Sequence, residues 1–448
     1  MKVLKVKELG LEAVKKTLDK ASFDEVELNP RIRAKNKELY GEDLTAVQIV
    51  DRIVNDVRHE GDSAVIKYTK LLDGADFKPE DFLVREDEYE TAYAQADKKV
   101  VQSLLKAIAN VRKYHEEQKP NSWITYRAHG SILGQSVIPL DRVGVYVPGG
   151  TAAYPSSVVM NVVPAKVAGV KDIIMMAPPS RDGKINPYVL IAAKEAGVNA
   201  IYKIGGAQAI AAMAFGTQTI PKVDKITGPG NIFVTLAKKA VYGHCDIDML
   251  AGPSEILIVA DKTADPVYTA ADMLSQAEHD MLASSIVITD DETLADKVLA
   301  NMEEQLAKLP RKEIAAASIE RNGRIILAEN IMQAIELANY SAPEHMEILT
   351  ENPFTMLPYV RHAGAVFLGQ YSPEPLGDYF AGPNHVLPTG GTARYYSVLN
   401  TETFMKRTSI ISYTQKALQE VSSDIIRLAE TEGLQAHANA IKLRGGKA

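Results

Sequence analysis

Apolar residues recur at helical spacing through the first 130 positions, which predicts packed helices there. Residues 45–72 are expected to form an amphipathic helix whose apolar positions are Val47, Val50, Ile53, Val54 and Val57. Residues 88–117 carry a second pattern of the same kind. Residues 1–29 are predicted to be a helical arm that ends near Asn29-Pro30, because the residue before a proline disfavours helix.

Beyond Val137 the pattern changes to short apolar strands that alternate with helices. A first run places strands at residues 143–147, 173–176 and 200–204, with a fourth ending at Ile226, and a second run places strands at 255–260, 285–289, 324–327 and 365–368. This alternation predicts βαβ units and parallel sheets. The expected fold class is α/β, with two Rossmann-like modules that suggest a duplication. The helical N-terminal arm precedes them, and a helical C-terminal tail follows Tyr396.

Composition and charge narrow the class of protein. A chain of 448 residues is long enough for about two or three domains. It has 50 basic and 57 acidic residues, a net charge of −7 and no long single-sign run, which argues against nucleic acid as a partner. The single cysteine excludes an intrachain disulfide, and no run of about 18 apolar residues predicts a membrane span. We expect a cytoplasmic protein, and an enzyme.

Glycine-rich turns follow three of the predicted strands of the first module, and each precedes a helix. They are Pro148-Gly149-Gly150, Gly205-Gly206 and Gly228-Pro229-Gly230-Asn231. Free amides at a helix start favour a phosphate, and ligands of parallel sheets bind beyond the carboxyl ends of strands. None of the turns has the full G-x-G-x-x-G pattern, so a tight loop without a nucleotide is the alternative interpretation.

Titratable side chains gather in the second module. Gln276 and His279 have the spacing of one helical face, where they could hold a cation such as zinc or could simply be a solvated face. The other candidates lie in loops or near the C-terminus: Glu344, His345, Asp378, His385 and His437. Glu344-His345 could also be a helix-start carboxylate beside an exposed histidine, and His437 could be a polar position of the last helix.

Several motifs in one order carry a family resemblance. The stretch Ile247-Asp248-Met249-Leu250-Ala251-Gly252-Pro253-Ser254-Glu255 precedes Gln276-Ala277-Glu278-His279, Pro343-Glu344-His345 and Gly382-Pro383-Asn384-His385. Glu432-Gly433-Leu434-Gln435-Ala436-His437 follows near the C-terminus. With Val143-Gly144-Val145-Tyr146-Val147-Pro148-Gly149-Gly150 upstream, the chain closely resembles the histidinol dehydrogenase family over nearly its whole length.

The resemblance implies roles for particular residues. The zinc ligands, for one ion per subunit, would be Gln276, His279, Asp378 and His437. Glu344 would activate water, and His345 would handle the proton of the substrate hydroxyl. The substrate, L-histidinol, would be contacted by Ser254, Gln276, His279, His345, Asp378, His385, Glu432 and His437. NAD would lie near Tyr146, Gln208 and Asn231. In a homodimer, Glu432 and His437 would come from the partner subunit.

The resemblance also implies a division of the chain into four units. These are an N-terminal arm (1–29), a zinc and substrate domain (30–140 and 253–398), an NAD-binding domain (141–252) and a dimerisation tail (399–448). The expected reaction is the four-electron oxidation of L-histidinol to L-histidine through L-histidinaldehyde, the end of histidine biosynthesis. Two hydride transfers to NAD and one water addition balance it. The alternatives are a related zinc- and NAD-dependent dehydrogenase of another small polar alcohol, such as a sulfonated diol, a zinc hydrolase or deaminase, and a non-catalytic metal-binding protein.

Overall fold

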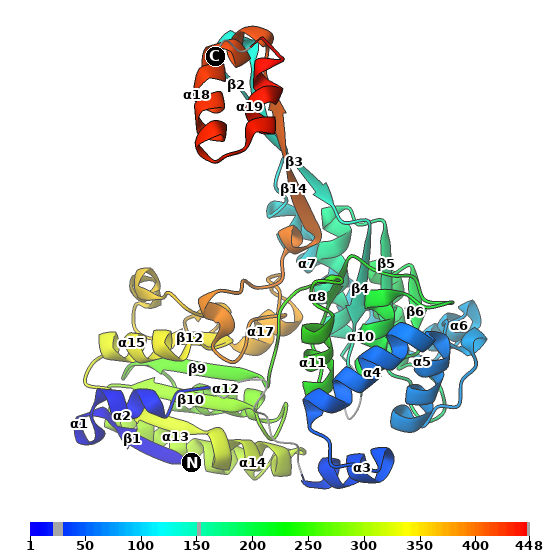
Figure 1. Ribbon diagram of the computed structural model, residues 1–448. Helices are drawn as coiled ribbons and strands as arrows, with labels where there is room; N and C mark the ends of the chain where they lie inside the picture. Colours follow the sequence, from blue (N-terminus) through cyan, green and yellow to red (C-terminus); the bar gives the residue numbers. More distant parts are fainter. Residues whose placement is uncertain (21–29, 150–153, 446–448) are drawn as a thin grey trace.

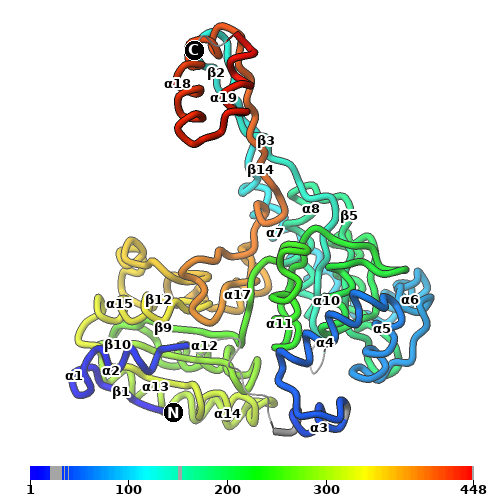
Figure 2. Tube along the Cα trace, in the orientation of Figure 1, coloured from blue at the N-terminus to red at the C-terminus, as the bar shows by residue number. Residues whose placement is uncertain are grey.

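The computed structural model describes residues 1–20, 30–149 and 154–445, and it has two α/β bodies and a projecting arm (Figures 1 and 2). Parts of three expected features, the end of the N-terminal arm, the turn at Gly150 and the last residues of the tail, lie outside the described residues. Among the described residues, no helix combines the length and the apolar character needed to cross a bilayer.

The first body is built on a five-stranded parallel sheet with the order β6-β5-β4-β7-β8. Its strands are β4 (Arg142–Tyr146), β5 (Asp172–Met176), β6 (Ala200–Tyr202), β7 (Lys225–Thr227) and β8 (Asp246–Ile247). Helices α8 (Pro155–Ala168) and α9 (Pro187–Ala196) pack in one apolar cluster, and α10 (Gly206–Phe215) and α11 (Ile232–Val241) pack in the other. Burial on both faces explains why these strands are nearly continuous apolar runs.

The second body is built on a six-stranded parallel sheet with the order β1-β11-β10-β9-β12-β13. Its strands are β1 (Lys2–Lys5), β9 (Glu255–Ala260), β10 (Ser284–Thr289), β11 (Arg324–Leu327), β12 (His345–Leu349) and β13 (Ala365–Leu368). One apolar cluster joins the sheet to α12 (Pro266–Ala277), α13 (Glu292–Leu306) and α14 (Lys312–Asn322). The other joins it to α1 (Val6–Leu9), α2 (Leu11–Lys16) and α15 (Ile331–Ser341).

The two bodies share one topology. Counted from the first strand of each βαβ run, both sheets have the order third, second, first, fourth, fifth, and β1 is added outside β11. This is the doubly wound arrangement whose switch point lies between the first and fourth strands. The predicted α/β fold with two Rossmann-like modules is confirmed, and the shared order is what a duplication would leave.

The helices between residues 46 and 117 differ from the sequence prediction in their ends and in their location. They are α4 (Ala46–Glu60), α5 (Asp62–Tyr68), α6 (Glu86–Gln95) and α7 (Lys98–Glu117). Gly61 ends α4 at φ +60°, where a β-carbon would collide with the side chain of Gln218, and Asp97 caps a separate α7. All four pack against the first body, whereas the predicted division places residues 30–140 with the second.

The sequence did not predict β1, β8 or β12, nor the three strands of a third sheet. The N-terminal arm carries the expected helices, but its first residues form β1, an edge strand of the six-stranded sheet. The C-terminal tail begins with β14 (Met405–Ser412), which pairs with β3 (Ile132–Pro139) in an antiparallel sheet that also holds β2 (Trp123–Tyr126). Helices α18 (Gln415–Thr431) and α19 (Gln435–Lys442) lie at the far end of this projecting arm (Figure 1).

The remaining elements are short or peripheral. They are α3 (Pro30–Tyr40), α16 (Pro353–Met356), α17 (Glu374–Tyr379), the π-turn at Thr69–Asp73, and 3₁₀ turns at Pro79–Asp81, Ala128–Gly130, Leu357–Tyr359, Thr392–Arg394 and Thr401–Phe404.

Candidate active site

Glu344 and His345 meet at the amino ends of two neighbouring strands. Helix α15 ends in the left-handed residue Ala342, which turns the chain so that His345 opens β12 beside β9. The backbone N–H of Glu255 donates to Glu344 Oε2 at 2.8 Å, and the carbonyl of Glu255 lies 3.0 Å from His345 Nδ1. Because a carbonyl only accepts, Nδ1 is the donor, and the second ring nitrogen is left for other chemistry.

Asp378 and His385 face this pair from the chain that follows β13. Asp378 lies on α17, and its Oδ1 is 3.7 Å from His345 Nε2. His385 Nδ1 donates to the carbonyl of Asp378 at 3.0 Å, which orients the ring. The segment 375–385, which was predicted to be a loop, thus begins within α17, and it places a carboxylate and an imidazole beside Glu344 and His345.

Gln276 and His279 approach from the C-terminal end of α12. Asp265 caps this helix and Pro266 occupies its first position. Because the helix follows β9, it begins at the carboxyl end of that strand and runs back toward the amino end, where Glu344 and His345 lie. It ends at Ala277, and His279 lies in the following turn, where its N–H donates to the carbonyl of Gln276 at 3.2 Å. The pair is therefore held by a turn at the helix end and not by one helical face.

Several of these side chains, with Glu374 of α17, form a candidate cation site. Ligand atoms of His279, Glu374 and Asp378 all lie within 4.8 Å of one another. The side chain of Gln276 is 1% exposed, and neither its oxygen nor its nitrogen has a hydrogen-bond partner among the described residues. A buried amide without a partner is costly unless something binds it, and a metal would satisfy its oxygen. The donor set of carboxylate, imidazole and amide oxygens fits zinc.

Burial and charge shift the pKa values in this group. Burial raises the pKa of Glu344 to about 8, although the neighbouring His345 opposes the shift. Burial would lower the pKa of His345, but the charges of Glu344 and Asp378 outweigh it and raise the value to about 10. Burial also raises the pKa of Asp378, but hydrogen bonding to His345 and the histidine charges lower it overall. Each shift has a neighbouring group as partner, as is common at functional sites.

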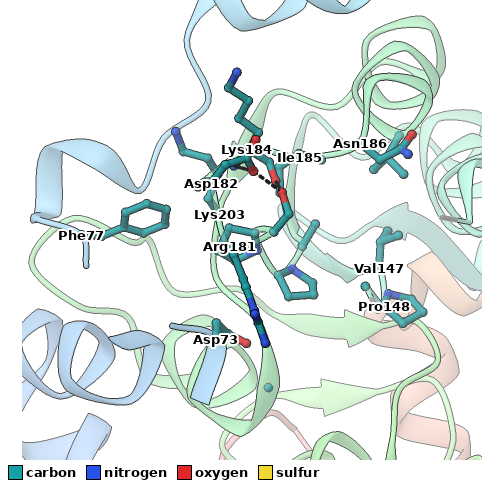
Figure 3. A pocket seen from close by; sticks show the side chains of 18 of the residues that line it. Asp73, Phe77, Val147, Pro148, Arg181, Asp182, Lys184, Ile185, Asn186 and Lys203 are labelled. Carbon is teal, nitrogen blue, oxygen red and sulfur yellow. Dashed lines mark hydrogen bonds between the residues drawn. The ribbon is translucent and has the colours of Figure 1, made fainter. Parts of the chain in front are cut away.

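A second site lies at the carboxyl ends of the strands in the first body. A cavity of about 1650 Å³ opens there and is lined by Tyr146, Pro148, Lys203 and Asn231, among others. Figure 3 shows Phe77, Arg181, Lys184 and Lys203 around it. Gly228, at φ +116°, passes so close to Tyr146 that a β-carbon would lie 2.0 Å from the Tyr146 carbonyl oxygen. Glycine is therefore required where the turn after β7 meets the end of β4, at the switch point.

The three residues expected near NAD lie in or beside this cavity. Tyr146 lines it, and its buried hydroxyl accepts the N–H of Gly206 at the start of α10 at 3.1 Å. Asn231 lines it as well, but its side chain also caps α11 by accepting from Phe233 and Val234. Gln208 does not line the cavity, although its Nε2 donates to Asp73, which does.

The remaining residues that were expected to bind substrate or metal are Ser254, Glu432 and His437. Ser254 is half-buried directly before β9, and its carbonyl accepts the N–H of Ser284. Glu432 and His437 are exposed on the projecting arm, far from α12 and α17 (Figure 1). A single chain therefore brings His279 close to Asp378, with Gln276 in the last turn of α12, but it leaves Glu432 and His437 on the projecting arm.

Comparison with known proteins decides the family. The chain matches the family model for histidinol dehydrogenase over residues 34–445. It is 55% identical over 395 residues to the histidinol dehydrogenase of Heliobacterium mobile, which covers 88% of this chain and 92% of the relative. The Bacillus subtilis histidinol dehydrogenase gives the same identity and coverage. The chain belongs to the histidinol dehydrogenase family. The resemblance found in the sequence is thus confirmed.

A solved histidinol dehydrogenase also has this fold. The crystal structure of the enzyme from Elizabethkingia anophelis superposes with a TM-score of 0.89 at 38% identity, over 99% of this chain and 98% of that one. The agreement extends over the arm as well as both bodies, so the whole arrangement belongs to the histidinol dehydrogenase fold.

Sequence reasoning missed a set of buried carboxylates beside the histidinol dehydrogenase motifs. Glu374 precedes Asp378 by one helical turn of α17, accepts from Ser275 Oγ at 3.1 Å, and is 2% exposed. Its N–H donates to Glu347 Oε1, and Glu347 lies fully buried in β12 with Asp272 nearby. Burial raises the pKa of both Glu347 and Asp272. The available signal was Glu347 itself, a charged residue inside an apolar strand.

Proposed function

We propose that the chain oxidises L-histidinol to L-histidine through L-histidinaldehyde, as a zinc-dependent, NAD-linked enzyme at the end of histidine biosynthesis. The observation that carries this proposal is the Glu344–His345 pair, which touches Asp378 beside the cluster with His279. Family membership supports the substrate, since relatives more than half identical to this chain are histidinol dehydrogenases.

The reaction needs two proton-handling groups, and the pair supplies them. Oxidation of a primary alcohol to a carboxylate removes four electrons and adds one water. His345 takes the hydroxyl proton through Nε2, the ring nitrogen that the Glu255 carbonyl does not occupy. Glu344 then deprotonates the water that adds to the aldehyde. A general base must lie within hydrogen-bond reach of its proton, and two adjacent residues at one turn satisfy this for both steps.

Gln276, His279 and Asp378 would hold the zinc ion, with His437 of a second subunit as the fourth ligand. Glu374 lies close enough to support this set, because its carboxylate belongs to the same cluster. When bound, zinc supplies a positive charge that orients the substrate nitrogens and offsets the carboxylates around His345. NAD would accept the hydrides from the cavity bordered by Tyr146 and Asn231, with Gln208 beside it. Ser254, His385 and Glu432 would contact the substrate.

A homodimer is part of the proposal, since Glu432 and His437 cannot serve their roles from their own arm. The arm has a small apolar core of Ile426, Ala429 and Ala438, with Ile441 against it. Large apolar side chains remain exposed on it, namely Trp123, Ile124, Tyr126, Ile411, Leu428 and Leu443. Such a surface favours a protein partner. The cytoplasmic location stays a prediction, and so do the other boundaries of the four-part division, whereas residues 46–117 pack against the first body as described above.

The decisive experiment measures NADH formation from histidinol, identifies the product, and repeats the assay after chelation and zinc add-back. We expect two NADH per histidine, loss of turnover on chelation, and recovery with zinc. Turnover of a sulfonated diol but not of histidinol would favour the related dehydrogenase, and hydrolysis without NADH would favour a zinc hydrolase.

A further experiment separates the two catalytic roles. Glu344→Gln is expected to slow the conversion of histidinaldehyde to histidine by about 10²-fold or more, the usual contribution of a general base. Oxidation of the alcohol to the aldehyde in a single turnover would be affected less. Normal aldehyde oxidation by this variant would show that Glu344 is not the base.

A further inference from the structure

Glu255 makes contact with both catalytic residues through its backbone and is itself anchored through its side chain. Its N–H donates to Glu344 Oε2, and its carbonyl accepts from His345 Nδ1, as described above. The position of one peptide segment at the start of β9 therefore determines the orientation of the base and of the imidazole. Any group that fixes this segment acts on both catalytic side chains.

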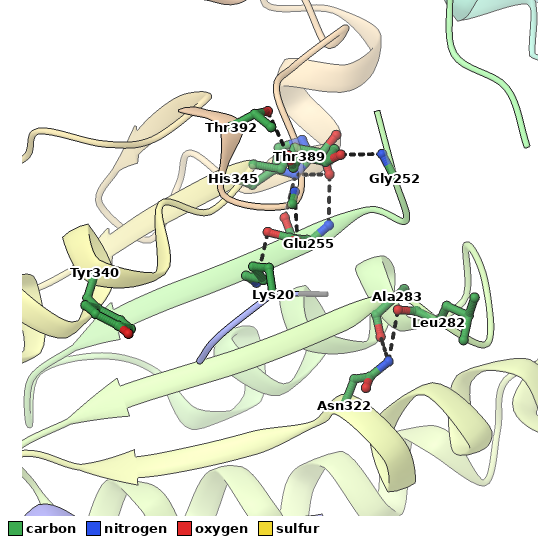
Figure 4. Close-up of polar contacts among 12 residues, drawn as sticks. Lys20, Gly252, Glu255, Leu282, Ala283, Asn322, Tyr340, His345, Thr389 and Thr392 are labelled. Carbon is green, nitrogen blue, oxygen red and sulfur yellow. Dashed lines mark hydrogen bonds and ion pairs between the residues drawn. The ribbon is translucent and has the colours of Figure 1, made fainter. Parts of the chain in front are cut away.

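The side chain of Glu255 is buried and is held from two sides (Figure 4). Oε1 accepts the backbone N–H of Gly390 at 3.2 Å. Oε2 lies 3.2 Å from Nζ of Lys20, which follows α2 in the N-terminal arm. The turn that contains Gly390 is tied to the segment before β9 a second time, because Thr389 Oγ1 accepts the N–H of Gly252.

Lys20 balances a charge that would otherwise be costly. Oε2 of Glu255 receives no hydrogen bond within the described part of the chain, so the ammonium group of Lys20 is the cation that compensates it there. A buried carboxylate that loses its counter-charge is strongly destabilised, so the segment that carries it is no longer held in place. Glu255 is also close enough to Glu344 for its charge to raise the pKa of that carboxyl. Lys20 therefore acts on the catalytic pair in two ways: it anchors Glu255, and it offsets a charge that raises the pKa of Glu344.

The N-terminal residues reach this position through a defined path. Strand β1 pairs with β11, helix α2 packs on the sheet face, and Asp19 accepts the hydroxyl of Tyr340 on α15 at 2.6 Å. The last contact fixes the residue immediately before Lys20, so the ammonium is delivered by an anchored segment.

We propose that Lys20 and Glu255 are positioning residues: their ion pair fixes the backbone that aligns Glu344 and His345. The inference rests on the proposed function, because it assumes that these two residues carry the proton transfers. It adds the N-terminal arm to the catalytic machinery, although neither Lys20 nor Glu255 is assigned any contact with substrate.

The test compares Lys20→Met with Lys20→Arg and with Lys5→Met. Lys5 is the matched control. It lies on the same N-terminal arm, at a surface position where it pairs with Glu292 of α13 and has no contact with Glu255. We expect Lys20→Met to lower kcat by about 10- to 100-fold, the usual cost of losing a residue that orients a catalytic group, with less than about a threefold change in KM. In the pH profile of kcat for Lys20→Met, the acid limb should move to higher pH, because the uncompensated Glu255 carboxylate raises the pKa of Glu344. Lys20→Arg should restore most of kcat, and Lys5→Met should match the wild type.

Glu255→Gln completes the test, since it removes the charge but keeps the size. It should lower kcat without moving the acid limb upward, because no carboxylate is left to act on Glu344. Wild-type kcat and pH profile in Lys20→Met would overturn the proposal, and so would an equal loss in Lys5→Met, which would indicate general weakening of the arm. Thermal unfolding of each variant checks that it is folded.

One readout does not depend on turnover. In protein with ¹⁵N-labelled histidine, the Nδ1–H signal of His345, assigned by its absence from His345→Asn, should shift or broaden in Lys20→Met and remain in Lys5→Met. An unchanged signal would overturn the positioning role. Failure of the wild type to oxidise histidinol would instead contradict the proposed function, while the signal would still decide whether Lys20 orients the ring.

Discussion

The five-stranded and six-stranded sheets have the same strand order, but their candidate functional side chains lie at opposite strand ends. In the first body the cavity opens beyond the carboxyl ends, next to Tyr146 and Asn231. In the second body the site forms at the amino ends, where Glu255 opens β9 and His345 opens β12. The usual rule for parallel sheets therefore describes the first body and not the second.

Helix direction gives a physical reason for this difference. Helices α10 and α11 begin at the cavity of the first body, so their free N–H groups and positive partial charge face an anionic ligand. Helices α12 and α15 end at the site of the second body, where the partial charge is negative. One fold thus offers a place for a dinucleotide at one end and a place for a cation at the other.

Loss of His345 is the largest effect that this comparison predicts. His345→Asn should lower kcat for histidinol by about 10²- to 10⁴-fold, because it removes the group proposed to take the hydroxyl proton. Zinc content, measured by metal analysis, and NAD binding, measured by calorimetry, should stay close to those of the wild type. If His345→Asn also loses NAD binding, the cavity of the first body and the site of the second body are not separate.

His115 joins the two bodies and should make their contact sensitive to acid. It is buried on α7, its Nδ1 donates to the carbonyl of Val111, and its Nε2 accepts from Asn384 in the loop that carries His385. Burial lowers its pKa to about 4. The folded protein therefore favours the neutral ring, and a proton on Nε2 would place two donors face to face.

The sign of the pH effect follows from that direction. The contribution of His115 to stability is complete above the unfolded pKa of about 6.5 and is lost as the pH falls toward 4, by up to roughly 3 kcal/mol. Denaturant unfolding of wild type and His115→Gln between pH 7.5 and 4.5 measures it. The variant should lose less stability over this range, and an exposed control, His59→Gln, should behave as the wild type does.

Two buried glutamines offer a matched test of the two sites. Gln276 lies at the cation site and Gln208 beside the cavity, and each has a side-chain oxygen without a hydrogen-bond partner in the described chain. Gln276→Leu should weaken zinc binding at least about 10- to 100-fold, the loss seen even for outer partners of a metal. Gln208→Leu should raise the KM for NAD by about tenfold, the effect of one lost buried hydrogen bond.

Each glutamine variant is the control for the other. Gln276→Leu should retain NAD binding, and Gln208→Leu should retain zinc. If both variants lose both ligands, the substitutions disturb the packing between the bodies, and the separation of the two sites is wrong.

Sequence reasoning located most strands of both modules because their burial on two faces makes them continuous apolar runs. It missed the two-residue strand β8, and it missed β12, where His345 and Glu347 interrupt the apolar run. It missed β1 and β14 because neither is buried on two faces. Both are edge strands whose pairing partners lie far away in the sequence, β11 for the first and β3 for the second, and β14 is almost wholly exposed. It also ran α4 into α5 across Gly61, since apolar periodicity alone does not mark the end of a helix.

The motifs gave the residues of the candidate site but not the groups behind them. Glu347 meets Glu374 and Asp272 only after β12, α17 and α12 have packed, so nothing near Glu347 in the sequence identified its neighbours. The same holds for Lys20, whose partner Glu255 is 235 positions away along the chain. Contacts of this kind depend on tertiary packing, whereas the motif residues could be read locally.

Tyr146 gives the smallest and most local prediction. Its hydroxyl accepts the N–H of Gly206, the first residue of α10, and so aligns the start of that helix with the cavity. Tyr146→Phe leaves this N–H without its partner at a cost of about 1 kcal/mol, which should raise the KM for NAD about fivefold. Zinc content should not change, because the cation site lies at the other sheet. Tyr242→Phe, at an exposed position, is the control. An equal rise in the KM for NAD in that variant would show that the effect does not arise at the cavity.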